Sequence, residues 1–87
     1  STGGLLTLQT SDATVGSGDV LGALQFQAPN EADGSDGALV SASIVAEADA
    51  TFTSTANNTD MVFKLGTDGA VTEKMRLRHE GILERLS

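Results

Sequence analysis

The side chains that could carry out acid–base or nucleophilic chemistry are few in this sequence. His79 is the only histidine among the 87 residues, and cysteine is absent. A Ser-His-Asp arrangement would therefore have to use His79, which lies in the basic run KMRLRHEG. Catalysis needs several convergent groups with tuned pKa values, and this run does not provide them. We interpret His79 as a side chain at the end of a strand, near Glu80.

Glu47 and Asp49 are the closest candidates for a catalytic pair of carboxylates, because they would share one face of an extended chain. Glycosidases use such pairs. A polysaccharide cleft also needs aromatic side chains on which sugars stack, and the sequence has neither Trp nor Tyr. Both acids are explained as solvent-facing polar residues of a strand in which polar and apolar residues alternate. We therefore predict no catalytic residues and a protein that is not an enzyme.

The segment NEADGSDG, residues 30–37, places oxygen-bearing side chains at Asn30, Asp33 and Asp36. Their spacing is three residues, whereas an EF-hand loop repeats its ligands every two residues and ends in a bidentate Glu. One histidine and no cysteine exclude an imidazole or thiolate cluster within one chain. The glycine-containing segment SDATVGSGD has no lysine, so it is not a phosphate loop. We predict no metal site and no cofactor, with the 30–37 loop as the one cation candidate.

The formal charge of −7 is distributed unevenly along the chain. Residues 1–63 contain eight acids and no Lys or Arg, whereas residues 64–87 contain all five bases and four acids. An acidic surface repels nucleic acid and anionic membranes, and the sequence has no run of ~18 apolar residues that could span a bilayer. We therefore expect no nucleic-acid partner and no membrane insertion. We expect one of two roles for the basic segment from Lys74 to Arg78. It pairs with an acidic face, which belongs to the same chain or to a neighbouring chain, or it forms a solvated edge of the sheet.

Alternation of apolar and polar residues with a period of two predicts strands joined by turns rich in Gly, Asp and Asn. The expected strands lie in LLTLQT, DVLGALQFQA, residues 38–53, MVFKLG and EKMRLRHEG. The Asp68-Gly69 pair between the last two is typical of a tight hairpin turn. The sequence predicts no long helix, although GILERL near the C-terminus allows a short one.

The longest of these segments, ALVSASIVAEADATFT at residues 38–53, is rich in alanine. Its eight even positions are all apolar, whereas its odd positions become polar toward Glu47 and Asp49. A helix would separate polar from apolar residues poorly, so we predict a strand. We expect its small even face to point inward, close to other strands. Its odd face is expected to be solvated or to pair with the basic segment.

The length of the chain points to self-association. A chain of 87 residues buries roughly 60–65 % of its unfolded surface, so its core is marginal unless something reinforces it. The composition excludes disulfides and a single-chain metal cluster, which leaves oligomerisation. We therefore predict self-association with a shared core, in which the alanines of the even face could approach a symmetry axis closely.

Several motifs occur in an order that resembles a known segment. They are D-x-x-V-G-x-G-D-V-L-G at residues 12–22, F-x-A at 26–28, A-S-I-x-A-x-A-D at 42–49, T-x-M-V-F-K at 59–64 and T-E-K-M-R-L at 72–77. The ordered set resembles a segment that recurs in tail-fibre and tailspike-like structural proteins of tailed bacteriophages. Such proteins often continue into R-I/L-x-x-x-G-N-V-G-I-G and a self-cleaving chaperone, whereas this chain reads RLRHEGILERLS. Because it opens on STGG without methionine, we expect a piece of a longer protein.

The resemblance implies a fibrous, trimeric β-structured module in a virion appendage. We expect an all-β fold, a small antiparallel β-sandwich or β-prism-like fibre module, with residues 1–19 as N-terminal strand and linker, 20–78 as β core and 79–87 as C-terminal tail. The expected role is that of a non-enzymatic structural component of a phage tail fibre, located on the tail or capsid surface of the virion. Its expected partners are copies of itself and other virion proteins, with a host surface glycan as a further candidate. The alternative is a capsid-decoration or carbohydrate-binding adhesin tip module.

Overall fold

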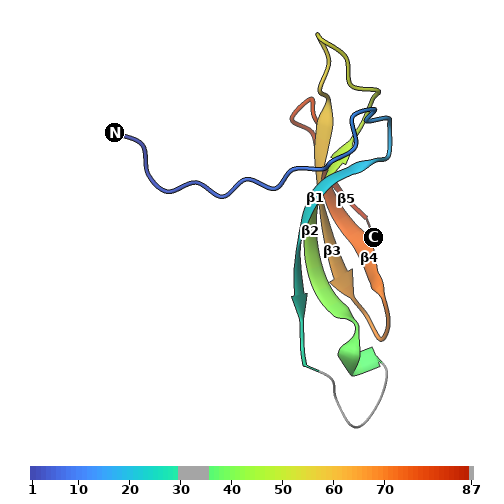
Figure 1. Ribbon diagram of the computed structural model, residues 1–87. Coiled ribbons are helices and arrows are strands. Elements are labelled where there is room, and N and C mark those ends of the chain that lie inside the picture. The colour runs from blue at the N-terminus through green and yellow to red at the C-terminus, as the bar shows by residue number, and fades with distance from the viewer. Residues whose placement is uncertain (30–35, 87) are drawn as a thin grey trace.

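The computed structural model describes residues 1–29 and 36–86, in which one antiparallel sheet of five strands is found (Figure 1). The strands are β1 (Val20–Gln27), β2 (Val40–Ala48), β3 (Thr59–Gly66), β4 (Val71–Leu77) and β5 (Leu83–Arg85), and a single 3₁₀ turn, η1 (Asp36–Ala38), precedes β2. Each strand pairs with the next one along the chain, so the sheet is a meander with β1 and β5 at its edges. The predicted antiparallel all-β fold is confirmed. The described residues form a single open sheet and not the second packed layer that the predicted β-sandwich needs.

The alanine-rich stretch forms a strand rather than a helix, as its alternation predicts. β2 pairs with β1 on one side and with β3 on the other. It ends at Ala48, because the chain bends at Asp49 and Ala50, and is therefore shorter than the predicted segment 38–53. Beyond the bend, the Asp49 N–H donates to the Asn58 carbonyl at 2.8 Å, so residues 49–58 form the loop between β2 and β3.

The short C-terminal helix that GILERL allowed is wrong, because β5 lies there and extends the sheet into the segment expected to be a tail. Arg76 of β4 stands opposite Glu84 of β5. Gly81 has a φ of +93°, a left-handed conformation that glycine adopts without steric cost, and its N–H donates to the Arg78 carbonyl at 2.8 Å. This turn folds the chain back onto β4.

The predicted hairpin turn at Asp68 and Gly69 joins β3 to β4, and Asp68 takes a positive φ of 57°, which aspartate tolerates better than most residues. Further along this ladder, a β-bulge leaves Lys74 without a partner on β3. Because a bulge adds one residue to one strand only, it brings Glu73, instead of Lys74, to the same face of the sheet as Arg76.

The strand register divides the side chains of the sheet between two faces. The first, here called the apolar face, carries Gly22, Leu24, Phe26, Ala42, Ile44, Ala46, Met61, Phe63, Leu65, Met75, Leu77 and Leu83, together with Thr72 and, on the edge strand β5, Arg85. The second, here called the polar face, carries Gln25, Ser43, Val45, Glu47, Asp60, Val62, Lys64, Glu73, Arg76 and Glu84.

Burial is the reverse of what the alternation of β2 suggested. Ser43, Val45, Asp60 and Val62 on the polar face are buried, and the last two are 0 % exposed. The even positions of β2 from Val40 to Ala46 are partly exposed, and Ala48 at the end of the strand is buried. Of the two alternatives predicted for the odd face, pairing with the basic segment is the one observed, through Glu47 and Arg76. Arg76 also stands directly opposite Val62, and a long side chain of this kind covers its apolar neighbours with its stem.

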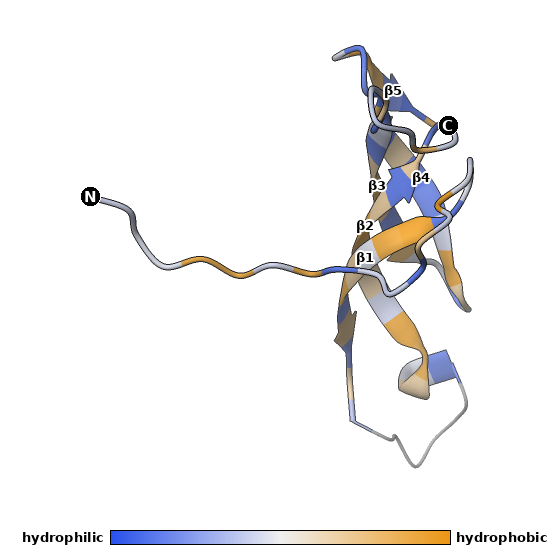
Figure 2. Cartoon of the chain, turned by 45° about the horizontal axis from the view of Figure 1, so that its top comes forward, coloured by the Kyte–Doolittle hydropathy of each residue, from blue (hydrophilic) through white to orange (hydrophobic). Residues whose placement is uncertain are grey.

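The first twelve residues, here called the arm, form no strand, and the N-terminal part of the arm extends away from the sheet (Figure 1). The predicted strand LLTLQT lies in the arm and pairs with no strand among the described residues, so that prediction is wrong. The chain is tied to the sheet after the arm, where the Phe52 N–H donates to the Val15 carbonyl and the Gly18 N–H to the Ala48 carbonyl. Figure 2 shows hydrophobic residues along the free part of the arm.

Candidate functional site

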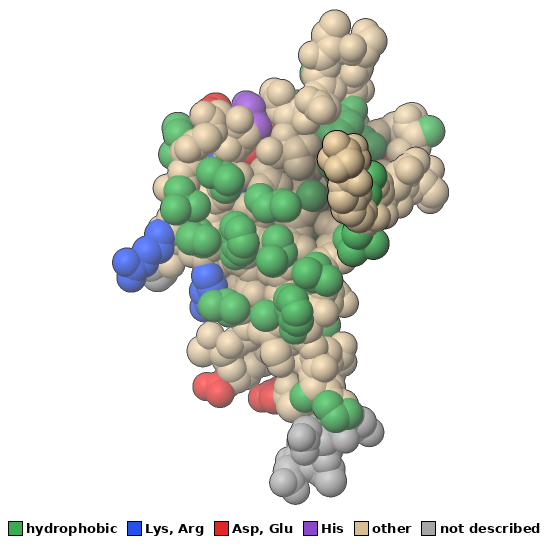
Figure 3. Space-filling view, turned by 90° about the vertical axis from the view of Figure 1, so that its left-hand side faces the viewer, with side chains coloured by type: hydrophobic (Ala, Val, Ile, Leu, Met, Phe, Trp, Pro, Cys, Tyr) green, Lys and Arg blue, Asp and Glu red, His purple; other side chains and the backbone are tan. Residues whose placement is uncertain are grey.

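The apolar face has no covering layer in the part of the chain that the structure describes. Large side chains on it are 41–60 % exposed although they come from four different strands: Leu24, Phe26, Met61, Leu65, Leu77 and Leu83. Figure 3 shows hydrophobic side chains gathered across this side of the molecule, with Lys and Arg at one margin. Contiguous exposed apolar surface of this kind marks an interaction site in a protein that is stable in water.

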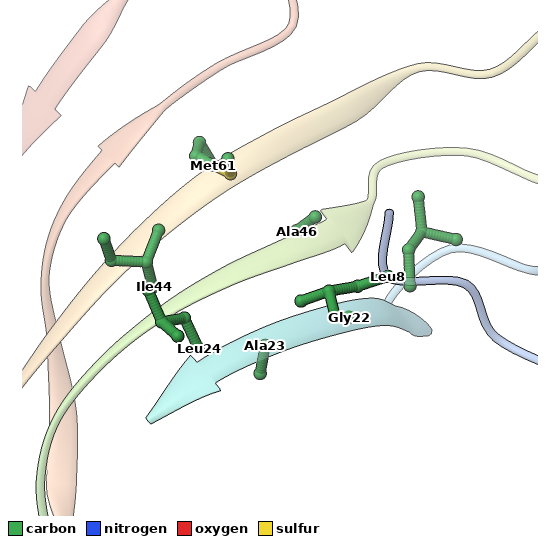
Figure 4. A pocket seen from close by; sticks show the side chains of 8 residues that line it. Leu8, Gly22, Ala23, Leu24, Ile44, Ala46 and Met61 are labelled. Carbon is green, nitrogen blue, oxygen red and sulfur yellow. The ribbon is translucent and has the colours of Figure 1, made fainter. Parts of the chain in front are cut away.

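An apolar pocket of about 410 Å³ lies at the end of this face nearest the arm. Figure 4 shows its lining from the arm, β1, β2 and β3: Leu8, Leu21, Gly22, Ala23, Leu24, Ile44, Ala46 and Met61. None of these side chains is charged or can donate a hydrogen bond. The pocket can therefore accept apolar side chains but offers nothing that would orient a polar substrate.

Leu8 fixes the place where the arm leaves the sheet. It lies so close to Gly22 that a Cβ added to this glycine would stand 2.9 Å from the Leu8 Cβ, a separation that requires one of the two to move. Glycine at position 22 thus lets the arm lie directly on β1. Leu8 is the point of the arm that contacts the apolar face.

The polar face is organised around the guanidinium of Arg76, whose side chain is 13 % exposed. Its Nε and Nη2 donate to the two carboxylate oxygens of Glu73 at 2.9 and 2.8 Å. Its Nη1 donates to Asp60 Oδ2 at 2.7 Å, and Nη2 also donates to Glu47 Oε1 at 3.1 Å. One arginine therefore links three carboxylates from three strands, and the bidentate contact fixes its orientation.

Asp60 is the most buried charged group described, with its side chain 0 % exposed. Burial alone would raise the pKa of this carboxyl, but the Arg76 guanidinium, the His79 backbone N–H at 3.0 Å and nearby Arg78 hold the pKa below its ordinary value. The hydrogen bonds from Arg76 likewise lower the pKa of Glu73. Both acids are thus held in the ionised form that the network requires.

Arg78 and His79 extend this network to the end of the sheet. The Arg78 Nε donates to Glu84 of β5, and its Nη1 lies 3.6 Å from Asp60 Oδ2. The Nδ1 atom of His79 lies 2.9 Å from Asp49 Oδ2 and 3.2 Å from Glu80 Oε1. The prediction that His79 is a strand-end side chain near Glu80 is confirmed, although Asp49 is its nearer partner.

The geometry around His79 serves ion pairing better than catalysis or metal binding. Ligand atoms of Asp49, Asp60 and His79 lie within 4.8 Å of one another, but both oxygens of Asp60 already accept hydrogen bonds from Arg76 and from the His79 N–H. A cation at this position would also be repelled by the positive charges of Arg76 and Arg78, which lie 2.7 and 3.6 Å from Asp60 Oδ2. Among the described residues, no serine or threonine hydroxyl bonds to the His79 ring, so the pair with Asp49 lacks a nucleophile.

Glu47 and Asp49, the candidate carboxylate pair, have separate partners: Glu47 pairs with Arg76 and Asp49 with His79. The basic segment thus complements an acidic face of its own chain, which is one of the two alternatives that the charge distribution left open. The cation candidate at residues 30–37 lies outside the described residues except for Asp36 and Gly37, both of which are exposed.

Two features were missed by sequence reasoning. The buried position of Asp60 was missed, although an acid next to an apolar strand and an arginine on a later strand is a signal for a cross-strand ion pair. The arm was taken for a strand, although the adjacent Leu5 and Leu6 break the two-residue alternation. In an extended chain these leucines point to opposite sides, so one sheet cannot bury both.

Comparisons with family models, with curated proteins and with solved structures find no match to this chain. Across residues 1–29 and 36–86, the chain also has no helix with the length and apolar character needed to cross a membrane. The functional interpretation therefore depends on the geometry of the two faces and on the motifs in the sequence.

Proposed function

We propose that this chain is a non-enzymatic structural module that assembles with copies of itself through the apolar face and serves as part of a bacteriophage tail fibre. The observation that carries the proposal is the apolar face, on which large side chains of four strands are about half exposed in the single chain. A domain normally buries such a face in a second layer of secondary structure. The described residues supply one layer, and in this proposal a second copy supplies the other.

A second copy suits this face chemically. The register places no charged side chain among its central positions on β1, β2 and β3, so two apolar faces can meet without burying an unpaired charge. The ion pairs around Arg76 lie on the opposite face, where they are formed within the chain. The charged side chain on the apolar face is Arg85, which stands opposite Met75 on the edge strand β5. The polar face would therefore remain the outer surface of the assembly.

A threefold arrangement is favoured by the small residues on the side of the face formed by β1 and β2. Ala42 and Ala46 flank Ile44 on β2, the strand next to the edge strand β1, and Gly22 lies next to Ala46 on β1. Small side chains let strands of neighbouring copies approach a common axis more closely than leucines would. Three such sheets around an axis form the β-prism-like homotrimer with a shared core that we propose.

The assignment to a tail fibre depends on the resemblance of the ordered motifs. The motif A-S-I-x-A-x-A-D falls on β2 and runs to Asp49, and its alternate positions Ala42, Ile44 and Ala46 contribute to the apolar face. The motifs at 59–64 and 72–77 fall on β3 and β4. The residues that carry the resemblance thus coincide largely with those that would form the shared core.

A matched pair of substitutions on β1 tests the proposal. Leu24→Asp places a charge on the apolar face at a side chain that is 48 % exposed, so the fold of the single chain should tolerate it. Gln25→Asp places the same charge one residue further, on the polar face. By sedimentation velocity at micromolar concentration, we expect the unsubstituted chain and Gln25→Asp to be trimers and Leu24→Asp to be a monomer. A Leu24→Asp chain that remains a trimer would contradict the use of this face.

The virion role is tested separately. An antibody raised against the chain should label tail appendages in electron micrographs of the phage particles that contain it. Labelling confined to the capsid would support capsid decoration instead. Saturable glycan binding that is lost on changing the exposed Asn57 and Asn58 of the loop before β3 would support the adhesin tip, whereas a purely structural module should bind no glycan.

A further inference from the structure

The free end of the arm is an apolar segment without a partner in its own chain. Leu5 is 87 % exposed and Leu6 is 81 % exposed, more than any other large apolar side chain described. The first eleven residues carry no charged side chain. Adjacent exposed leucines in an uncharged segment are costly in water, and this cost disappears if they pack against another apolar surface.

Because of its direction, the arm would contact any second copy that packs on the apolar face. Leu8 lies on this face beside Gly22 (Figure 4), and from there the arm runs outward toward the side of the molecule that Figure 3 presents. A second sheet packed on the apolar face must therefore meet the arm of the first.

The spacing of the leucines matches the thickness of such an interface. Packed sheets lie ~10 Å apart. An extended chain advances roughly 3.3 Å per residue, so Leu6 and Leu5 stand about 7 and 10 Å beyond Leu8 along the arm. They reach the level of the opposing sheet, whereas Leu8 remains at the level of its own.

We infer that, in the assembled module, the arm of each copy lies on the apolar face of the next copy and packs Leu5 and Leu6 against its pocket around Leu24, Ile44 and Met61. This inference rests on the self-association proposed above and identifies the segment that completes the shared core. An arm that passes from each copy to the next is a heterologous contact, which closes into a ring under threefold symmetry.

The absence of cysteine allows a direct test with single thiols in separate chains. A Leu6→Cys chain is mixed with an isotopically labelled Met61→Cys chain in denaturant, refolded, oxidised and analysed by intact mass without reduction. A disulfide between an unlabelled and a labelled chain can form only between two copies. The control mixture replaces Met61→Cys with Gln25→Cys, a comparably exposed position on the opposite face.

We expect the mixed disulfide of the Leu6→Cys and Met61→Cys chains to exceed that of the control mixture several-fold. Equal yields in the two mixtures, from a sample that native mass spectrometry shows to be a trimer, would overturn the inference about the arm and leave the proposed self-association standing. A sample that stays monomeric, in both mixtures and in the unsubstituted chain, would overturn both.

Discussion

Replacing Arg76 by alanine is the substitution whose effect on stability the structure defines best. Arg76 makes the direct ion pair with Asp60 at 2.7 Å, and the Asp60 side chain is 0 % exposed. Without Arg76, this carboxylate would keep the His79 N–H and the more distant Arg78, 3.6 Å away. The Arg76→Ala chain must therefore bury a poorly compensated charge or protonate it.

The size of the effect follows from the exposure of the partners. Removing one member of a buried ion pair costs about 3–5 kcal/mol. Glu47 and Glu73, the other partners of Arg76, have side chains that are 24 % and 26 % exposed and recover part of their hydration. We therefore expect the lower end, about 3 kcal/mol. For a domain of this length, this corresponds to a fall in Tm of roughly 12–24 °C.

Thermal unfolding followed by circular dichroism measures this change. All chains must be compared at one protein concentration, because self-association itself raises the Tm. Lys64→Ala is the matched control, since Lys64 is a base on the same face that makes no ion pair within the described ranges, and its loss should cost less than about 1 kcal/mol. Adding Asp60→Asn to Arg76→Ala should recover part of the lost stability, because the stranded charge is removed.

Two results would refute this reasoning. One is an Arg76→Ala chain no less stable than Lys64→Ala, which would mean that the Arg76 contacts contribute no more than an exposed charge. The other is a double variant less stable than Arg76→Ala alone, which would mean that Asp60 stabilises the fold without its arginine.

Three further predictions concern acid, the arm and the core. The pKa values of Asp60 and Glu73 are lowered in the folded chain, so the ionised carboxylates stabilise the fold above about pH 4 and lose this effect as the pH falls further. The Tm measured from pH 6 to pH 2.5 should therefore drop below pH 4, and a Tm that does not change with pH would contradict the network. Gly22→Ala should push Leu8 off β1, so limited proteolysis should cleave the arm faster than in the unsubstituted chain, and an unchanged rate would contradict the close contact. Val62→Ala, at a fully buried position, should cost about 2 kcal/mol in chemical denaturation, and a loss below ~0.5 kcal/mol would contradict a core on the polar face.

The strands could be predicted from the sequence because each one is specified locally. The alternation in β2, β3 and β4 and the turn at Asp68 and Gly69 are short-range signals. The short turns at residues 67–70 and 78–82 place β3, β4 and β5 side by side, since short turns join neighbouring antiparallel strands. The connections 28–39 and 49–58 are longer, so the pairing of β1 with β2 and of β2 with β3 does not follow from turn signals alone. The ends of the strands were less predictable: β2 stops at Ala48 because of a bend that the apolar even positions do not reveal.

The distribution of burial and the ion-pair network could not be predicted in this way. Whether Val62 is covered depends on the register that sets Arg76 opposite it, and register is a property of two strands. The contact between Arg76 and Glu73 depends on the bulge at Lys74, because a regular strand would place Lys74 on that face instead. The role of Leu5 and Leu6 depends on a partner that lies outside the single chain.

The oligomeric state of the unsubstituted chain is the most direct test of the central claim that the apolar face is the core of an assembly of three copies. Native mass spectrometry at micromolar concentration should show one dominant species with a mass of three 8.9 kDa chains, which is about 27 kDa. A dominant monomer under the same conditions would contradict the claim, since the chain would then be stable with its apolar face in water.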